Sequence, residues 1–195
     1  MTVEVVSGGD PRECADPFAA AFAEEPGLGW ICGQGLPAKR RWFAATLRTH
    51  ATLAGGALYT ARVAGAPAGA AMVTPANQRP GNFAQLAWTA RVGLGCGPTA
   101  VRRTLDYLGA STAPANALTL EFVGVAPELR GRGVGRVLLE RMIADAAGSP
   151  IYLTTADPAN PGLYRRFGWR ETGRVRVAEL VVVAMTRPGD PINQS

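Results

Sequence analysis

The sequence is poor in the residues that bind metal ions or form disulfides. It has one histidine, His50, and three widely spaced cysteines, Cys14, Cys32 and Cys96, with no C-x-x-C pair. Zinc sites and disulfide frameworks need clusters of these residues. We therefore expect no metal site and no disulfide scaffold, and this cysteine usage favours a reducing compartment, the cytoplasm.

Long hydrophobic runs are also missing. No apolar run reaches about 18 residues, so the sequence predicts no membrane-spanning helix. The first ten residues, MTVEVVSGGD, lack the basic start and the apolar core of a secretory signal. We expect a cytoplasmic protein with no membrane partner, either a monomer or a homodimer.

Lysine is nearly absent, because Lys39 is the only one among 20 basic residues. The excess of arginine, with abundant alanine and glycine, is typical of a G+C-rich genome. The net charge of +5 permits an anionic ligand without establishing one. The basic runs 39–41 and 102–103 are interpreted as solvated faces, because no alternation of aromatic and basic residues indicates nucleic-acid binding. His50 is likewise expected on a helix surface.

Length and hydrophobic pattern predict a single mixed α/β domain over residues 1–188 and a disordered tail over 189–195. Strands are expected at 3–6, 57–63, 66–74, 117–125 and 151–155, with a final strand pair over 171–186. Helices are expected at 11–25 (kinked at Pro17 or restarted at Asp16), 38–54, 82–109 in two pieces, 133–147 and 160–167. The glycine-rich segment that continues to about residue 37 is predicted as a loop.

The stretch ELRGRGVGRVLLE, residues 128–140, alternates glycine with arginine between a predicted strand and a predicted helix. The start of a helix presents free backbone N–H groups and partial positive charge, and glycine lets the backbone approach an anion closely. A diphosphate suits such a loop. A P-loop would need a Gly-Lys pair, and a dinucleotide fingerprint would need its glycines directly after the strand. A tight turn with solvated arginines is the alternative interpretation.

Two sequence blocks resemble the GNAT superfamily of acetyl-CoA-dependent N-acetyltransferases. In LEFVGVAPELRGRGVGRVLLERM, residues 130–135 match the [RQ]xxGx[GA] pattern of motif A in that family. In IYLTTADPANPGLYRRFGW, motif B is matched at Asn160, Tyr164, Gly168 and Trp169. More weakly, the two ends of the chain resemble puromycin N-acetyltransferase and its actinobacterial relatives, although the sequence around 153–165 departs from theirs.

The resemblance implies an α/β (α+β) GNAT fold: a mixed, mostly antiparallel seven-stranded sheet, splayed at the centre and flanked by about four main helices. It also implies acetyl-CoA as cosubstrate, with pantetheine beside the splayed strand and the pyrophosphate on backbone amides of residues 130–136. The N–H of Val123 becomes a candidate donor to the reaction's oxyanion. The implied cofactor-binding residues are Val123, Gly124, Val125, Arg130, Gly131, Arg132, Gly133, Val134, Gly135, Arg136 and Asn160.

Acetyl transfer to an amine needs a base for the amine, a donor to the oxyanion and an acid for the leaving thiolate. Glu121 is the predicted base, because strand alternation places it on one face with Val123 and Val125, and a buried carboxylate requires a partner or a task. A rim position or a pairing with arginine is the alternative, and Glu24 and Glu25 are rival acids.

Tyr164 is the predicted general acid, since a phenol with a pKa near 10 stays protonated at neutral pH. A packed aromatic ring is the alternative interpretation. On the acceptor side we expect Trp30, in its glycine-rich loop, together with Glu121 and Thr155.

The preferred function is direct acetylation of a small-molecule amine in a ternary complex, with amine antibiotics among the candidate acceptors. A protein lysine or N-terminal acetyltransferase and a non-catalytic acyl-CoA- or ligand-binding protein are the alternatives.

Overall fold

Seven strands form one sheet in the order β1-β2-β3-β4-β5-β7-β6. The computed structural model describes residues 1–189, so residues 190–195 of the predicted tail lie outside the described part. The strands are β1 (Val3–Ser7), β2 (Ala57–Val63), β3 (Ala66–Thr74), β4 (Leu118–Val125), β5 (Ile151–Thr155), β6 (Arg170–Val177) and β7 (Leu180–Arg187). Only the β4–β5 pair is parallel. The expected seven-stranded, mostly antiparallel sheet is confirmed.

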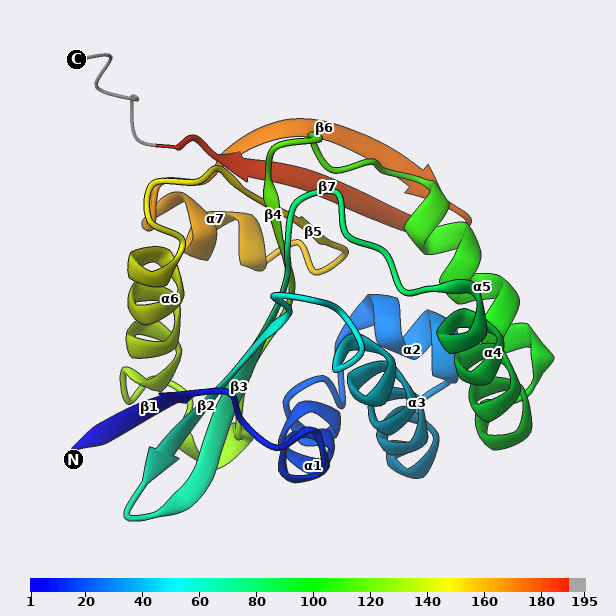
Figure 1. Ribbon diagram of the computed structural model, residues 1–195, viewed down its shortest axis with the longest axis horizontal. Coiled ribbons are helices and arrows are strands. Elements are labelled where there is room, and N and C mark those ends of the chain that lie inside the picture. Colours follow the sequence, from blue (N-terminus) through cyan, green and yellow to red (C-terminus); the bar gives the residue numbers. More distant parts are fainter. Residues whose placement is uncertain (190–195) are drawn as a thin grey trace.

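Helices cover both faces of this sheet (Figure 1). They are α1 (Pro11–Ala21), α2 (Pro26–Cys32), α3 (Leu36–His50), α4 (Asn82–Cys96), α5 (Pro98–Gly109), α6 (Val134–Asp145) and α7 (Asn160–Arg165), with a 3-10 turn η1 (Pro127–Leu129). In Figure 1, α1 to α5 lie to the right of the central strands, and α6 and α7 lie to the left. Four of these helices have at least 12 residues: α3, α4, α5 and α6. No helix among residues 1–189 has the length and apolar character needed to cross a membrane.

Alternation along the strands divides the interior into two apolar cores. On β3, Met72 packs with α1 and α3, whereas its neighbour Val73 packs with α6. On β7, Val182 belongs to the core with α1 and α3, and its neighbour Val183 belongs to the core with α6. Successive side chains of a strand point to opposite faces, so the central strands are apolar on both sides and the sheet is covered twice.

Helix α2 is the element that the sequence analysis missed, because its glycines were interpreted as a loop. The helix starts at Pro26 with Glu25 as its cap, and burial of Leu28, Trp30 and Ile31 holds it against its neighbours. Elsewhere the differences are small. Helix α1 runs through Pro17 and ends earlier than expected, and α3 begins and ends a few residues earlier.

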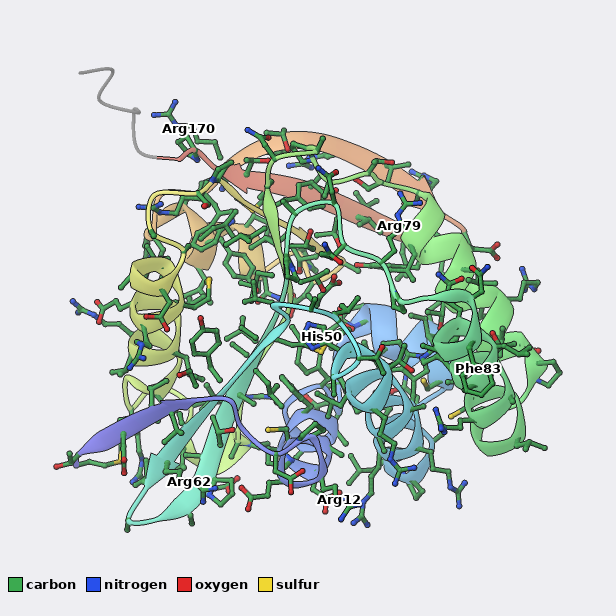
Figure 2. The ribbon with its side chains drawn as sticks, in the orientation of Figure 1. Arg12, His50, Arg62, Arg79, Phe83 and Arg170 are labelled. Carbon is green, nitrogen blue, oxygen red and sulfur yellow. The ribbon has the colours of Figure 1, made fainter. Side chains whose placement is uncertain are left out.

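Two polar residues that were expected on the surface are buried. Lys39 has no exposed surface, and its ammonium group donates to the carbonyls of Phe22, at 3.1 Å, and of Ala23. These carbonyls follow α1, so Lys39 fixes the segment that leads into α2. His50 lies at the end of α3 (Figure 2) and its Nε2 lies 3.0 Å from the carbonyl oxygen of Val73. Burial lowers the pKa of His50, so the neutral ring donates this bond.

Candidate active site

The sheet opens where β4 and β5 separate. The two strands pair only at the start of β4, and the last pair is Thr119–Tyr152. At the other end of β4, the N–H of Ala126 donates to a β3 carbonyl at 2.9 Å. Backbone N–H groups alternate in direction along a strand, so those of Val123 and Val125 point away from β3, into the opening. The predicted central splay is therefore present, and it leaves strand-edge groups of β4 without a strand partner.

Glu121 is the extra residue of a β-bulge in β4. Two successive residues of β3 pair with Leu120 and Phe122, which leaves Glu121 without an opposite residue. A bulge re-aims the neighbouring side chains, and Phe122 consequently packs on the side of α1 and α3 while Val123 and Val125 pack on the side of α6. The expectation that Glu121 shares a face with the two valines was wrong, because alternation does not continue through the bulge.

A cleft of about 610 Å³ runs from this opening to the start of α6. The glycine-rich loop forms one wall, and Gly131 and Gly133 have φ values of +74° and +86°. Glycine adopts these left-handed values without strain. A Cβ at either position would have no other atom within 4 Å, so the backbone faces open space. Because α6 begins directly after Gly133, the free N–H groups of its first turn face the same region.

Ten of the eleven predicted cofactor-binding residues line this cleft, and the exposed Arg132 is the exception. Arg130 donates to the carbonyl of Ala21 at 2.7 Å and so ties the loop to the end of α1. Arg136 forms an ion pair with Glu140, also at 2.7 Å. Each of these contacts uses one nitrogen of the guanidinium, so both arginines keep donors for an anion beside the backbone amides. Binding by these residues stays a prediction.

A smaller cavity of about 100 Å³ adjoins the cleft, and we call it the inner cavity. It lies between β4 and helices α2, α3 and α5, and much of its wall is aromatic. Phe122 makes edge-to-face contacts with Phe22 and with Trp42, each at 5.6 Å between ring centroids. Interlocked rings of this kind form a rigid wall. The five aromatic residues of the wall are Phe22, Trp42, Tyr107, Phe122 and Tyr164.

Glu25 lies where the two cavities meet. Its carboxylate caps α2 by accepting the N–H of Leu28 at 2.6 Å. Burial raises the pKa of Glu25, and hydrogen bonds from Leu28 and Gly27 partly offset this. A Cβ at Gly27 would lie 3.2 Å from both carboxylate oxygens, so glycine leaves room for this arrangement. The residues that line both cavities are Phe22, Glu25, Val123, Asn160 and Tyr164.

The three carboxylates considered from the sequence thus occupy different places. Glu25 lines both cavities, Glu121 lines only the inner cavity, and Glu24 lines only the cleft. The sequence treated Glu25 only as a rival to Glu121. The structure places it at the junction of the two cavities.

Tyr164 faces the same junction from α7. Its ring packs against Trp169, at 5.8 Å between centroids, and only 8% of its surface is exposed. Burial, and next the carboxylate of Glu25, raise the pKa of the Tyr164 phenol. The hydroxyl therefore stays protonated at neutral pH, as a proton donor must. The acid role of Tyr164 remains a prediction.

Asn160 begins α7 and is tied to the end of β5. Its side-chain amide donates to the hydroxyl of Thr155 at 3.1 Å, and the N–H of Asp157 approaches the same hydroxyl at 3.3 Å. Thr155 lines the inner cavity, as its predicted substrate contact requires. The structure thus gives Thr155 one definite task, the orientation of Asn160, and contact with an acceptor stays a prediction.

Trp30 lies elsewhere. It is buried in α2 rather than placed in a loop, and it lines neither cavity. The guanidinium of Arg103 lies over its ring, 5.1 Å from the centroid, and also donates to its carbonyl. The structure therefore does not support acceptor contact by Trp30, because its ring is engaged by α5.

Two cavity residues escaped the sequence analysis. Tyr107 on α5 and Thr154 on β5 both line the inner cavity. Burial raises the pKa of Tyr107 to about 12. No motif surrounds either residue, and they are 47 positions apart in the sequence, so only the folded chain brings them together.

Residues 54–171 match the acetyltransferase (GNAT) domain family. This stretch is more than half of the chain and contains the splayed strands, the glycine-rich loop and Tyr164. The chain belongs to the GNAT acetyltransferase family. The predicted enzyme class, an N-acetyltransferase of the GNAT type, is thereby confirmed. No curated protein matches the chain.

Solved structures share the GNAT fold at low sequence identity. A Corynebacterium glutamicum structure titled histone acetyltransferase HPA2 and related acetyltransferase is 22% identical, covers 99% of each chain and has a TM-score of 0.74. A ribosomal-protein-alanine N-acetyltransferase of Escherichia coli is 12% identical, covers 100% of this chain and 99% of its own, and has a TM-score of 0.60. A Thermus thermophilus acetyltransferase is 16% identical over 96% and 97%, with a TM-score of 0.58. These similarities establish the fold and give no specific support for the puromycin N-acetyltransferase group.

Proposed function

We propose that this GNAT protein transfers the acetyl group of acetyl-CoA to the amine of a small molecule by direct attack in a ternary complex. The observation that carries the proposal is the junction of two cavities of unequal size, lined by Glu25, Tyr164 and the edge of β4. A two-substrate reaction needs two sites that meet at one point.

The cleft fits the elongated, anionic cosubstrate. The N–H groups of Val123 and Val125 point into it and lack a strand partner, which suits an amide-bearing pantetheine arm. The left-handed glycines and the first turn of α6 supply amides for a pyrophosphate. When bound there, acetyl-CoA would supply an activated acetyl group at the junction.

Three groups of the chain then divide the chemistry. The Val123 N–H donates to the oxygen that gains negative charge, the phenol of Tyr164 protonates the leaving thiolate, and a carboxylate accepts the amine proton, directly or through water. Glu25 lines both cavities, whereas Glu121 lines only the inner cavity. We therefore assign the base to Glu25 in preference to Glu121.

The size of the inner cavity favours a small acceptor over a protein. A cavity of about 150 Å³ accommodates benzene, so about 100 Å³ admits a short amine or the amine-bearing end of a larger molecule such as an antibiotic. A histone tail or a protein N-terminus would need an open groove. The three cysteines are free thiols, which agrees with the proposed cytoplasmic location.

The test is thiol release from acetyl-CoA with a panel of amine antibiotics, polyamines, amino acids and peptides. We expect turnover with small amines that exceeds turnover with peptides at equal concentration. A preference for peptides would favour the protein-acetyltransferase alternative. Binding of acetyl-CoA without any turnover would favour the non-catalytic alternative.

A further inference from the structure

Glu121 is a carboxylate that the proposed chemistry leaves without a task. It faces the inner cavity from the bulge of β4, and it does not line the cleft. Burial raises its pKa, and the only group that offsets this is the hydroxyl of Thr74. No arginine, lysine or histidine of residues 1–189 forms an ion pair with it. The cost of an unpaired carboxylate in such a place is relieved by protonation or by a ligand that supplies positive charge.

The other carboxylate that lines the inner cavity is Glu25, which also lines the cleft. Glu25 is at the junction with the cleft, and the charges that act on it come from Asp157 and Lys39 rather than from Glu121. The other residues lining the cavity are mostly aromatic and aliphatic, and none of them is a lysine, an arginine or a histidine. The inner cavity therefore has one acidic group that it shares with the cleft, a second acidic group that lies outside the cleft, and a mostly apolar wall.

We propose that the acceptor carries a second positively charged group, which Glu121 binds in the inner cavity while the amine to be acetylated meets Glu25 at the junction. This inference rests on the proposed function and specifies its substrate class as short diamines or similar dications. The aromatic wall suits such a molecule, because the faces of Trp42 and Phe122 attract cations and their apolar surface packs against methylene groups.

The small volume of the inner cavity limits the size of the acceptor, and a short diamine such as putrescine is the first candidate. A volume of about 100 Å³ is smaller than the benzene-sized cavity, so an unbranched chain suits it better than a ring.

The experiment compares putrescine with n-butylamine, which share a four-carbon chain and differ by one ammonium group. Binding is measured by calorimetry with coenzyme A present, so that no turnover is needed. Charge-assisted hydrogen bonding predicts that the wild-type protein binds putrescine roughly tenfold to hundredfold more tightly. Glu121→Gln should remove this preference and leave n-butylamine affinity within about twofold. Glu4→Gln is the matched control, because Glu4 is an exposed strand residue outside both cavities.

Equal affinity of the wild-type protein for the two amines, or no binding of putrescine, would overturn the inference without any variant. An equal loss of affinity for both amines in Glu121→Gln would also overturn the inference, because the side chain would then act on the reacting amine or on the fold. Thiol release is measured in parallel. Tight, Glu121-dependent binding of putrescine with no thiol release would refute the proposed acetylation and leave the dication site standing.

Discussion

Replacing Tyr164 by phenylalanine should slow acetyl transfer strongly while leaving the protein folded and able to bind coenzyme A. The variant keeps the ring that packs 5.8 Å from Trp169 and loses only the hydroxyl at the junction. General acid catalysis contributes roughly 100- to 10,000-fold to a rate, so kcat should fall by at least about 100-fold. The dissociation constant of coenzyme A should change by less than about twofold, because the substitution leaves the glycine-rich loop and the first turn of α6 unchanged.

The assay is steady-state thiol release with the best acceptor of the panel, together with calorimetric binding of coenzyme A. An acetyl thioester of a more acidic thiol needs less help in departure, so it should restore much of the lost rate in Tyr164→Phe. Tyr59→Phe is the control, because Tyr59 is also buried but lines neither cavity. A fall in kcat of less than about threefold, or a loss that the acidic thiol does not reduce, would refute the acid assignment.

Three other predictions concern the base, the packing of β4 and the thiols. Glu25→Gln should lower kcat/KM by about 100-fold near pH 7. The loss should be smaller at high pH, because the amine is then already deprotonated before it binds. A loss in kcat/KM that does not change with pH would contradict the assignment of the base. Gly124→Ala would place a Cβ 2.7 Å from that of Ala21 and 3.0 Å from the ring of Phe22. Urea unfolding should therefore show a free energy of unfolding that is lower by about 1–3 kcal/mol. An unchanged free energy of unfolding would show that α1 shifts to make room for the methyl group. Burial raises the pKa of Cys32 to about 12. Its thiol should therefore react slowly with a disulfide reagent at pH 8 until denaturant is added. Rapid labelling of Cys32 in the native protein would show that this thiol is exposed.

The elements with strong local patterns were predicted closely. The hairpin of β2 and β3 and strand β5 have the expected bounds, because apolar alternation, a tight turn and flanking glycine or proline specify them locally. Helix α2 was missed although Glu25 and Pro26 form a capping signal. Its two glycines, Gly27 and Gly29, outweighed that signal, and burial of Trp30 and Ile31 against distant elements overcomes their low helix propensity.

Lys39 and His50 show the same limit for polar residues. The pattern of a helix indicates which face is apolar, but it does not indicate whether a second layer covers the polar face. Here the segment after α1 covers Lys39, and β3 covers His50. Each buried donor is tolerated because a backbone carbonyl of another element accepts its hydrogen bond.

The sequence by itself determined the family, the glycine-rich wall of the cleft and the position of Tyr164. These features are local, since left-handed glycines, a helix start and a strand end depend on neighbouring residues alone. The tertiary structure decided the acceptor side. Residues from Phe22 to Tyr164 converge on the inner cavity, the bulge turns Glu121 into it, and α2 brings Glu25 to the junction. Such convergence depends on packing between segments far apart in the chain, which no local pattern encodes.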